Sequence, residues 1–153
     1  MRPPTWIDDG RLIAGPHPYG RDPRHGPSEV KSLLGLGVTL FLDLTEEGEL
    51  EPYAHLVAPA RHLRIPVRDF TVPDEGELLH ALDVIDAELA VGGIVYVHCW
   101  AGCGRTGVVV GCWLVRHGNA PSRALDRIAE TRGLGCPQTL EQRLAILGWD
   151  AAR

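Results

Sequence analysis

Apolar and polar residues follow two patterns along the chain. Nearly continuous apolar runs at Val38–Leu44 and Ile94–His98 predict buried strands, and Arg11–Ala14 and Leu63–Val67, the latter interrupted by Pro66, are further strand candidates. Apolar residues that recur every three or four positions predict helices at Asp74–Val91 and Thr139–Leu147, and further helices are expected at Pro27–Gly35, Thr106–His117 and Pro121–Arg132. Strands that alternate with helices predict an α/β fold, a single domain over residues 1–153 whose central, mostly parallel sheet of four to five strands is flanked by helices.

Polar residues at two helix starts support this assignment. Asp74 precedes Glu77 by three residues, and Thr139 precedes Gln142 in the same way. This spacing is typical of a capping box, in which each side chain accepts or donates at the other residue's backbone. In the last helix, Leu140, Leu144 and Leu147 share one face, as an amphipathic helix requires.

Composition narrows the class of protein. The chain has 153 residues, of which 44% are hydrophobic and 23% charged, as in an ordinary globular domain. The net charge of −5 argues against a general nucleic-acid partner, which would need a basic surface. No apolar run reaches the length of a membrane span, so we expect no membrane partner either.

The cysteines indicate the redox setting. Cys99, Cys103 and Cys112 lie close together in the sequence and Cys136 stands apart, whereas a secreted protein more often spreads its cysteines to close long loops. The first residues lack the pattern of a signal peptide. We therefore expect a reducing, cytoplasmic location, with Cys112 in a helix core and Cys136 in loop packing.

One segment carries most of the chemical information. The predicted strand Ile94–His98 delivers Cys99 into a short polar loop that opens the helix beginning at Thr106. Gly102 and Gly104 allow backbone conformations in which successive N–H groups point inward and bind an anion. The helix N-terminus and Arg105 add positive charge, and such surroundings favour the nucleophilic thiolate of a cysteine.

The sequence His98-Cys99-x-x-Gly102-x-x-Arg105-Thr106-Gly107 resembles the signature loop of the cysteine-dependent protein tyrosine phosphatase superfamily. Segments Ile65–Phe70 and Gln138–Gln142 are similar to its general-acid and glutamine loops, so the resemblance extends from about Arg11 to Leu147 and fits a compact member of dual-specificity type. It implies a phosphate-binding loop (the signature loop) made of Cys99, Trp100, Ala101, Gly102, Cys103, Gly104 and Arg105.

The resemblance also implies a two-step mechanism. Cys99 attacks phosphorus and forms a phosphocysteine, while Arg105 and the loop N–H groups hold the phosphoryl oxygens. Asp69 protonates the leaving group and then takes a proton from water. Thr106 is expected to hydrogen-bond the Cys99 sulfur, and His98 to orient the loop from behind. No metal and no organic cofactor are implied.

Three assignments remain open on the sequence alone. Asp74 is a rival to Asp69 as general acid, although it also has a capping explanation. Gln138 and Gln142 match residues that support the hydrolytic water, but Gln142 fits equally well as the capping partner of Thr139.

The redox chemistry of Cys103 is the third open question. Cys103 lies inside the signature loop, where it is either a small side chain that points away or a resolving thiol for oxidised Cys99. Cys112 is the other candidate for that resolving thiol.

The predicted substrate is a phosphorylated protein or peptide. No obvious phosphotyrosine-recognition insertion is present, which predicts a shallow pocket that accepts phosphoserine and phosphothreonine besides phosphotyrosine. The loop has no Lys at positions 100, 101 and 103, whereas members acting on inositol phospholipids often carry one. The alternatives are a phosphatase for a phosphoinositide or an RNA 5′-phosphate, a phosphopeptide-binding module and a sulfurtransferase.

Overall fold

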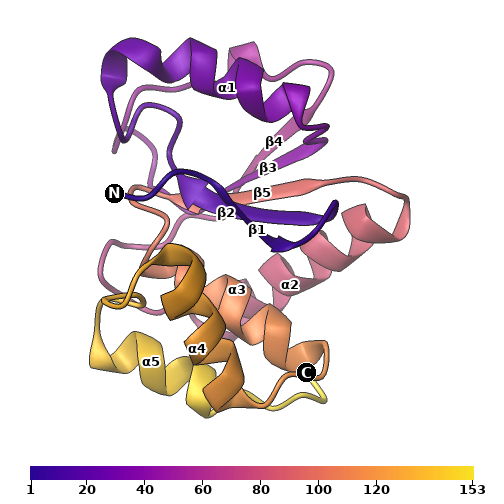
Figure 1. Cartoon of the computed structure of the whole chain (residues 1–153), viewed down its shortest axis with the longest axis vertical. Coiled ribbons are helices and arrows are strands. Elements are labelled where there is room, and N and C mark those ends of the chain that lie inside the picture. Colours follow the sequence, from indigo (N-terminus) through magenta and orange to yellow (C-terminus); the bar gives the residue numbers. More distant parts are fainter.

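The computed structural model describes residues 1–153 and has a layered α/β architecture (Figure 1). Its five-stranded sheet has the order β1-β2-β5-β3-β4. The strands are β1 (Thr5–Asp8), β2 (Leu12–Pro16), β3 (Leu40–Asp43), β4 (Arg61–Arg64) and β5 (Val95–Cys99). Only β1 runs antiparallel to its neighbour, so the expected α/β fold with a mostly parallel sheet is confirmed.

Five α-helices cover the two faces of the sheet unequally (Figure 1). One face carries α1 (Gly26–Gly35), and the other carries α2 (Glu75–Ala90), α3 (Arg105–Arg116), α4 (Pro121–Arg132) and α5 (Leu140–Leu147). The core on the α1 side contains 8 buried residues, and the core on the four-helix side contains 27. Short 3-10 helices lie at Pro23–His25 and Ala54–Leu56.

Helix α3 lies at the centre of the larger layer. It packs against α2, α4 and α5, and every residue from Arg105 to Val115 is buried. A helix that is apolar on all sides is stable only when neighbouring elements enclose it. None of the helices combines the length and the apolar character needed to span a bilayer.

The observed elements differ from the predicted ones in three places. The antiparallel strand β1 was not predicted, because its four residues at the edge of the sheet carry little periodic signal. Strand β4 begins at Arg61 and ends at Arg64, two residues earlier at its start than the expected Leu63–Val67. The apolar face of α5 points to solvent, with Leu140 66%, Leu144 53% and Leu147 45% exposed.

The predicted helix caps are both present. The Asp74 carboxylate accepts from the Glu77 N–H, and the Glu77 carboxylate accepts from the Asp74 N–H. Thr139 and Gln142 form the same reciprocal pair at the start of α5.

Candidate active site

The signature loop connects the central strand of the sheet to the central helix of the larger layer. Strand β5 lies between β2 and β3 and ends at Cys99, and α3 begins at Arg105. Both elements are buried, so the loop between them is held at the carboxyl end of the parallel strands. That edge is where α/β proteins place their ligand sites.

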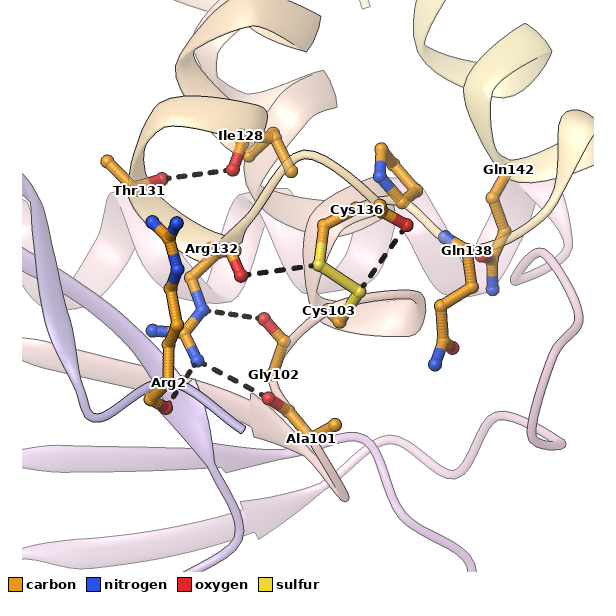
Figure 2. The surroundings of a disulfide bond; sticks show 12 residues. Arg2, Ala101, Gly102, Cys103, Ile128, Thr131, Arg132, Cys136, Gln138 and Gln142 are labelled. Atoms are coloured by element: carbon orange, nitrogen blue, oxygen red, sulfur yellow. Dashed lines mark hydrogen bonds between the residues drawn. A yellow bond between two sulfur atoms is a disulfide. The ribbon is translucent and has the colours of Figure 1, made fainter.

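The carbonyl groups of residues 100–102 in this loop accept hydrogen bonds from His17 and Arg132, and the side of the loop that faces these two residues is called its outer side. The Trp100 carbonyl accepts from the His17 N–H at 2.9 Å. The Ala101 and Gly102 carbonyls accept from the Arg132 guanidinium at 3.3 and 2.7 Å (Figure 2). Because a trans peptide plane directs its N–H opposite to its carbonyl, these bonds turn the following N–H groups inward.

None of the N–H groups of residues 100–104 donates to another group of the chain. Several inward-pointing donors, next to the N-terminus of α3, form a concave site that suits an anion. The backbone of residues 100–104 therefore offers several unbonded N–H groups, as the predicted phosphate-binding loop requires.

Arg132, at the end of α4, was missed by the sequence analysis. It is only 4% exposed, and besides Ala101 and Gly102 its guanidinium donates to the carbonyls of Arg2, Pro3 and Ala14 and to the Thr5 hydroxyl. No carboxylate pairs with it, and burial lowers its pKa. A buried cation with only neutral partners is costly, and here it places a positive charge directly behind the signature loop.

Gly102 permits the close approach of the loop to β2. Its φ of +68° lies in the left-handed region, and a Cβ there would collide with the backbone of Gly15. Any side chain at this position would force the loop away from the sheet.

Arg105 is buried at the front of the loop, with 1% of its surface exposed. Its two terminal nitrogens donate to the Glu49 carboxylate at 2.9 and 2.7 Å, and one also donates to the Val67 carbonyl. Its Nε–H is buried and has no hydrogen-bond partner in the chain. Burial would lower the pKa of Arg105, but the bonds to Glu49 and the charge of Cys99 outweigh it and raise that pKa.

Glu49 is a second residue that the sequence analysis missed. It lies in the connection after β3, and its side chain is 14% exposed. Burial would raise the pKa of Glu49, but hydrogen bonds from Arg105 and from the Glu46 backbone lower it below its ordinary value. Glu49 is therefore an anion at neutral pH, and its two hydrogen bonds fix the orientation of Arg105.

Asp69 lies with the site, as predicted. Its Oδ1 is 3.2 Å from an Arg105 nitrogen, and its side chain is 41% exposed. The rival Asp74 is bonded into the cap of α2. The residue after Asp69 is Phe70, which has a φ of 63° and is 60% exposed. Left-handed backbone in an aromatic residue is strained and is found mostly at functional loops.

His98 lies behind the loop, as expected. It is fully buried, and its Nδ1 is 3.0 Å from the Cys99 carbonyl, which can only accept. Burial lowers the pKa of His98, so the ring is neutral and its Nε2 accepts from the Tyr53 hydroxyl. Tyr53, on the far side of the sheet, thereby fixes the ring that supports Cys99.

The role expected of Thr106 is not seen. Its hydroxyl is buried and has no hydrogen-bond partner, so the predicted bond to the Cys99 sulfur is not formed. Thr106 belongs to the first turn of α3, where its own backbone is already fixed by the helix. A buried hydroxyl without a partner costs about 1–3 kcal/mol.

Gln138 and Gln142 both lie against the signature loop. A Cβ at Gly104 would come within 2.5 Å of the Gln138 amide oxygen and 2.9 Å of the Gln142 amide. Gln142 is also the capping partner of Thr139, and its amide nitrogen donates to the Thr71 carbonyl at 3.1 Å. The capping interpretation of Gln142 is thus correct, and the cap also joins α5 to the segment after Asp69.

The interpretation of Cys136 as loop packing was wrong, the resolving-thiol alternative for Cys103 is excluded, and the expected place of Cys112 in a helix core is confirmed. Cys103 forms a disulfide with Cys136, so Cys136 is more than loop packing and Cys103 is not a free resolving thiol (Figure 2). Cys112 is buried in α3, and burial raises its pKa to about 12, which leaves it an unreactive thiol. The argument for a reducing compartment loses its basis, because two of the four cysteines pair.

Two cavities lie on the molecule, and Cys99 lines neither of them. One of them adjoins the signature loop at Ala101 and Cys103. Cys99 itself is buried, whereas Trp100, the next residue, is 43% exposed.

Comparison with known proteins identifies relatives of this site. A family model described as "Swiss Army Knife protein, DSP-PTPase phosphatase domain" matches residues 2–143. Phosphatidylglycerophosphate phosphatase PTPMT1 of Arabidopsis thaliana is 34% identical over 134 residues, 82% of this chain and 36% of that protein. Dual specificity protein phosphatase CDC14AB of Danio rerio is 29% identical over 155 residues, 94% of this chain and 25% of that protein.

A solved structure shows the same fold. The crystal structure of Tk-PTP in the active form superposes with a TM-score of 0.83 and 27% identity, covering 100% of this chain and 99% of that one. The first curated relatives are longer, since the chain spans between 36% and 48% of their length.

Proposed function

This chain belongs to the DSP-PTPase phosphatase domains, and from that premise we propose that it hydrolyses phosphomonoesters through a phosphocysteine intermediate on Cys99. One observation carries the proposal. The Nε–H of Arg105 and the N–H groups of residues 100–104 have no acceptor in the chain, and all surround the end of β5. A tetrahedral oxyanion supplies the acceptors that these donors need.

In the first step, the Cys99 thiolate attacks phosphorus and the phosphorus–oxygen ester bond breaks. Asp69, protonated, gives its proton to the departing oxygen, and its exposed position at the mouth suits that role. The loop N–H groups and Arg105 stabilise the charge on the equatorial oxygens, where the transition state needs it.

In the second step, the Asp69 carboxylate takes a proton from water as the water attacks phosphorus. The phosphorus–sulfur bond breaks, and the Cys99 thiolate and inorganic phosphate are released. Gln138 and Gln142, beside Gly104, are close enough to the loop to orient this water. The chain supplies every group that these steps use.

We propose phosphoproteins as the substrate class, with phosphotyrosine accepted alongside phosphoserine and phosphothreonine. The sequence carries no obvious phosphotyrosine-recognition insertion, and this favours a site that also accepts the shorter phosphoserine and phosphothreonine side chains. Exposed Phe70 and Trp100 offer aromatic contacts to a peptide. The loop side chains at positions 100, 101 and 103 carry no charge for a second phosphate.

A lipid phosphomonoester is the second candidate. The observation that favours it is the 34% identity to a plant phosphatidylglycerophosphate phosphatase. A lipid whose headgroup carries a single phosphomonoester needs no additional charge at loop positions 100, 101 and 103.

The test is phosphate release from a matched panel in the presence of a metal chelator. The panel contains phosphotyrosine and phosphothreonine peptides, phosphatidylglycerophosphate and a phosphoinositide in detergent micelles. We expect turnover of both peptides by the wild type and none by Cys99→Ser. Turnover of the lipids alone would replace the protein substrate with the lipid, and no turnover of any ester by reduced, folded wild type would contradict the phosphatase assignment.

A further inference from the structure

The disulfide between Cys103 and Cys136 joins the signature loop to the segment that precedes α5 (Figure 2). Its two cysteines are separated by 33 positions, so the covalent ring encloses α3 and α4. The nucleophile position Cys99 is a free cysteine and takes no part in it.

Both ends of the bond lie among groups that hold the loop. Cys103 stands between Gly102, whose carbonyl is bonded to Arg132, and Gly104, which packs against Gln138 and Gln142. Cys136 Sγ lies 3.4 Å from the Arg132 carbonyl at the end of α4. The bond therefore ties the outer side of the signature loop to the elements that support it.

The disulfide is open to small molecules. It lines a cavity of about 350 Å³ together with Ala101, Gln138 and two arginines, Arg2 and Arg132. Arg2 donates to the Glu130 carbonyl and forms no ion pair with a carboxylate. A Cβ at Gly133 would lie 3.6 Å from the Arg2 Nε and 3.9 Å from Cys136 Sγ, so this guanidinium and this sulfur face the same space.

We propose that Cys103–Cys136 is a reversible redox modification site, opened by a small anionic thiol that enters this cavity, and that opening it lowers the reactivity of Cys99. The cavity has the size of a small-ligand site, and the guanidinium of Arg2, which has no carboxylate partner, attracts an anion. The effect on turnover rests on the proposed function, while the exchange reaction and the reactivity of Cys99 do not.

The exchange follows ordinary thiol–disulfide chemistry. A thiolate of the small molecule attacks Cys103 Sγ, forms a mixed disulfide and releases Cys136 as a thiolate, which takes up a proton. A second thiolate attacks the outer sulfur of the mixed disulfide and releases Cys103. The protein disulfide gains two electrons, and two molecules of the small thiol become one oxidised disulfide.

Opening the bond removes one of three attachments on the outer side of the loop, the others being Arg132 and the His17 N–H. Arg132 still holds the Ala101 and Gly102 carbonyls, so the loop keeps its fold but loses precision around Cys103 and Gly104. Poorer alignment of the inward N–H groups weakens both the activation of Cys99 and the binding of the phosphoryl group. We expect about a fivefold fall in both Cys99 alkylation rate and kcat/KM.

The experiment uses the full chain, purified without reductant and equilibrated with glutathione and glutathione disulfide at defined ratios. Alkylation in denaturant followed by mass spectrometry counts free thiols, which should rise from the two of the bonded form to four. Iodoacetamide alkylation of Cys99 in the folded protein and phosphate release are measured on the same samples. Both rates should fall together as the bond opens.

Two controls sharpen the test. The double variant Cys103→Ser with Cys136→Ser should show the lower rates at every ratio, and Cys112→Ser should behave as the wild type. Arg2→Gln should slow opening by glutathione a few-fold and leave opening by the neutral thiol β-mercaptoethanol unchanged.

Three results would overturn the inference. The bond could resist millimolar glutathione in the folded protein and open only in denaturant. It could open with no change in Cys99 alkylation, or Arg2→Gln could affect both thiols equally. Absence of turnover in every sample would contradict the proposed function instead, because thiol counts and Cys99 alkylation would still be measurable.

Discussion

The two sides of the signature loop are held by different kinds of contact. On the inner side, Arg105 meets the carboxylates of Glu49 and Asp69, and its Nε–H has no partner. On the outer side, Arg132 donates only to neutral oxygens, and the Cys103–Cys136 disulfide links the loop to the segment before α5. The inner contacts are ionic, and they leave the Arg105 Nε–H free to bind a substrate. On the outer side the Arg132 guanidinium is fully hydrogen-bonded, so these contacts fix the loop before any substrate binds.

This difference separates residues that take part in the reaction from residues that hold the signature loop in its reactive geometry. Substitutions on the inner side should change chemistry or phosphate affinity, and substitutions on the outer side should change the rate through loop geometry.

Cys99→Ser should lower kcat by at least ~10⁴-fold, because a serine hydroxyl in this loop lacks the thiolate's nucleophilicity. The measurement is phosphate release under saturating substrate, with vanadate binding as a check that the loop still folds. Cys112→Ser is the matched control, since it removes a buried thiol outside the loop. Retained turnover in Cys99→Ser would show that Cys99 is not the nucleophile.

Asp69→Asn should lower kcat by about 10²–10³-fold for alkyl phosphates and much less for esters with acidic phenol leaving groups. An amide cannot donate the proton that a poor leaving group needs. Asp74→Asn is the control, because Asp74 caps α2 and should cost stability without this leaving-group dependence. If the dependence follows Asp74 instead, the acid has been assigned to the wrong residue.

Arg132→Met should lower kcat by roughly 10²-fold, because the Ala101 and Gly102 carbonyls lose their donor and the opposite N–H groups lose alignment. Arg127→Met is the control on the same helix, since Arg127 donates to the Ile7 carbonyl away from the loop. Slower Cys99 alkylation in Arg132→Met would show that the effect acts through the loop. Equal effects of the two variants would point to loss of α4 packing instead.

Glu49→Gln should give the smallest effect, about a tenfold fall in kcat/KM, because Arg105 loses its bidentate charged partner but keeps the Val67 carbonyl and Asp69. The pKa of Glu49 is lowered in the folded state, so its stabilising effect is complete above its ordinary value of 4.5 and is lost as pH falls below that. Urea unfolding from pH 7 to 3 should therefore show the variant's stability deficit shrinking with acid. Glu47→Gln, an exposed neighbour, should show no deficit at any pH.

The sequence predicted the inner side better than the outer side. Cys99, Gly102 and Arg105 lie within seven positions on one strand–loop–helix unit, so local pattern was enough to identify them. Glu49 is 56 positions from Arg105, but it follows a strand whose carboxyl end meets that of β5, and this was a usable signal.

Arg132 and Cys136 gave no comparable signal. Their partners lie about thirty positions away, and the contacts arise only when α4 folds back over the loop. The leucines of α5 show a further limit, because periodicity grouped Leu140, Leu144 and Leu147 correctly but did not say which face is buried. Gln142 and Ile146 are the buried residues of that helix.

The most direct test of the central claim is to trap the covalent intermediate. Wild type is mixed with a phosphotyrosine peptide, quenched in acid within the first turnover and digested for mass spectrometry. We expect a phosphoryl group on the peptide that contains Cys99, and none on the corresponding peptide of Cys99→Ser. Phosphate release with no phosphorylated Cys99, together with an active Cys99→Ser variant, would contradict it.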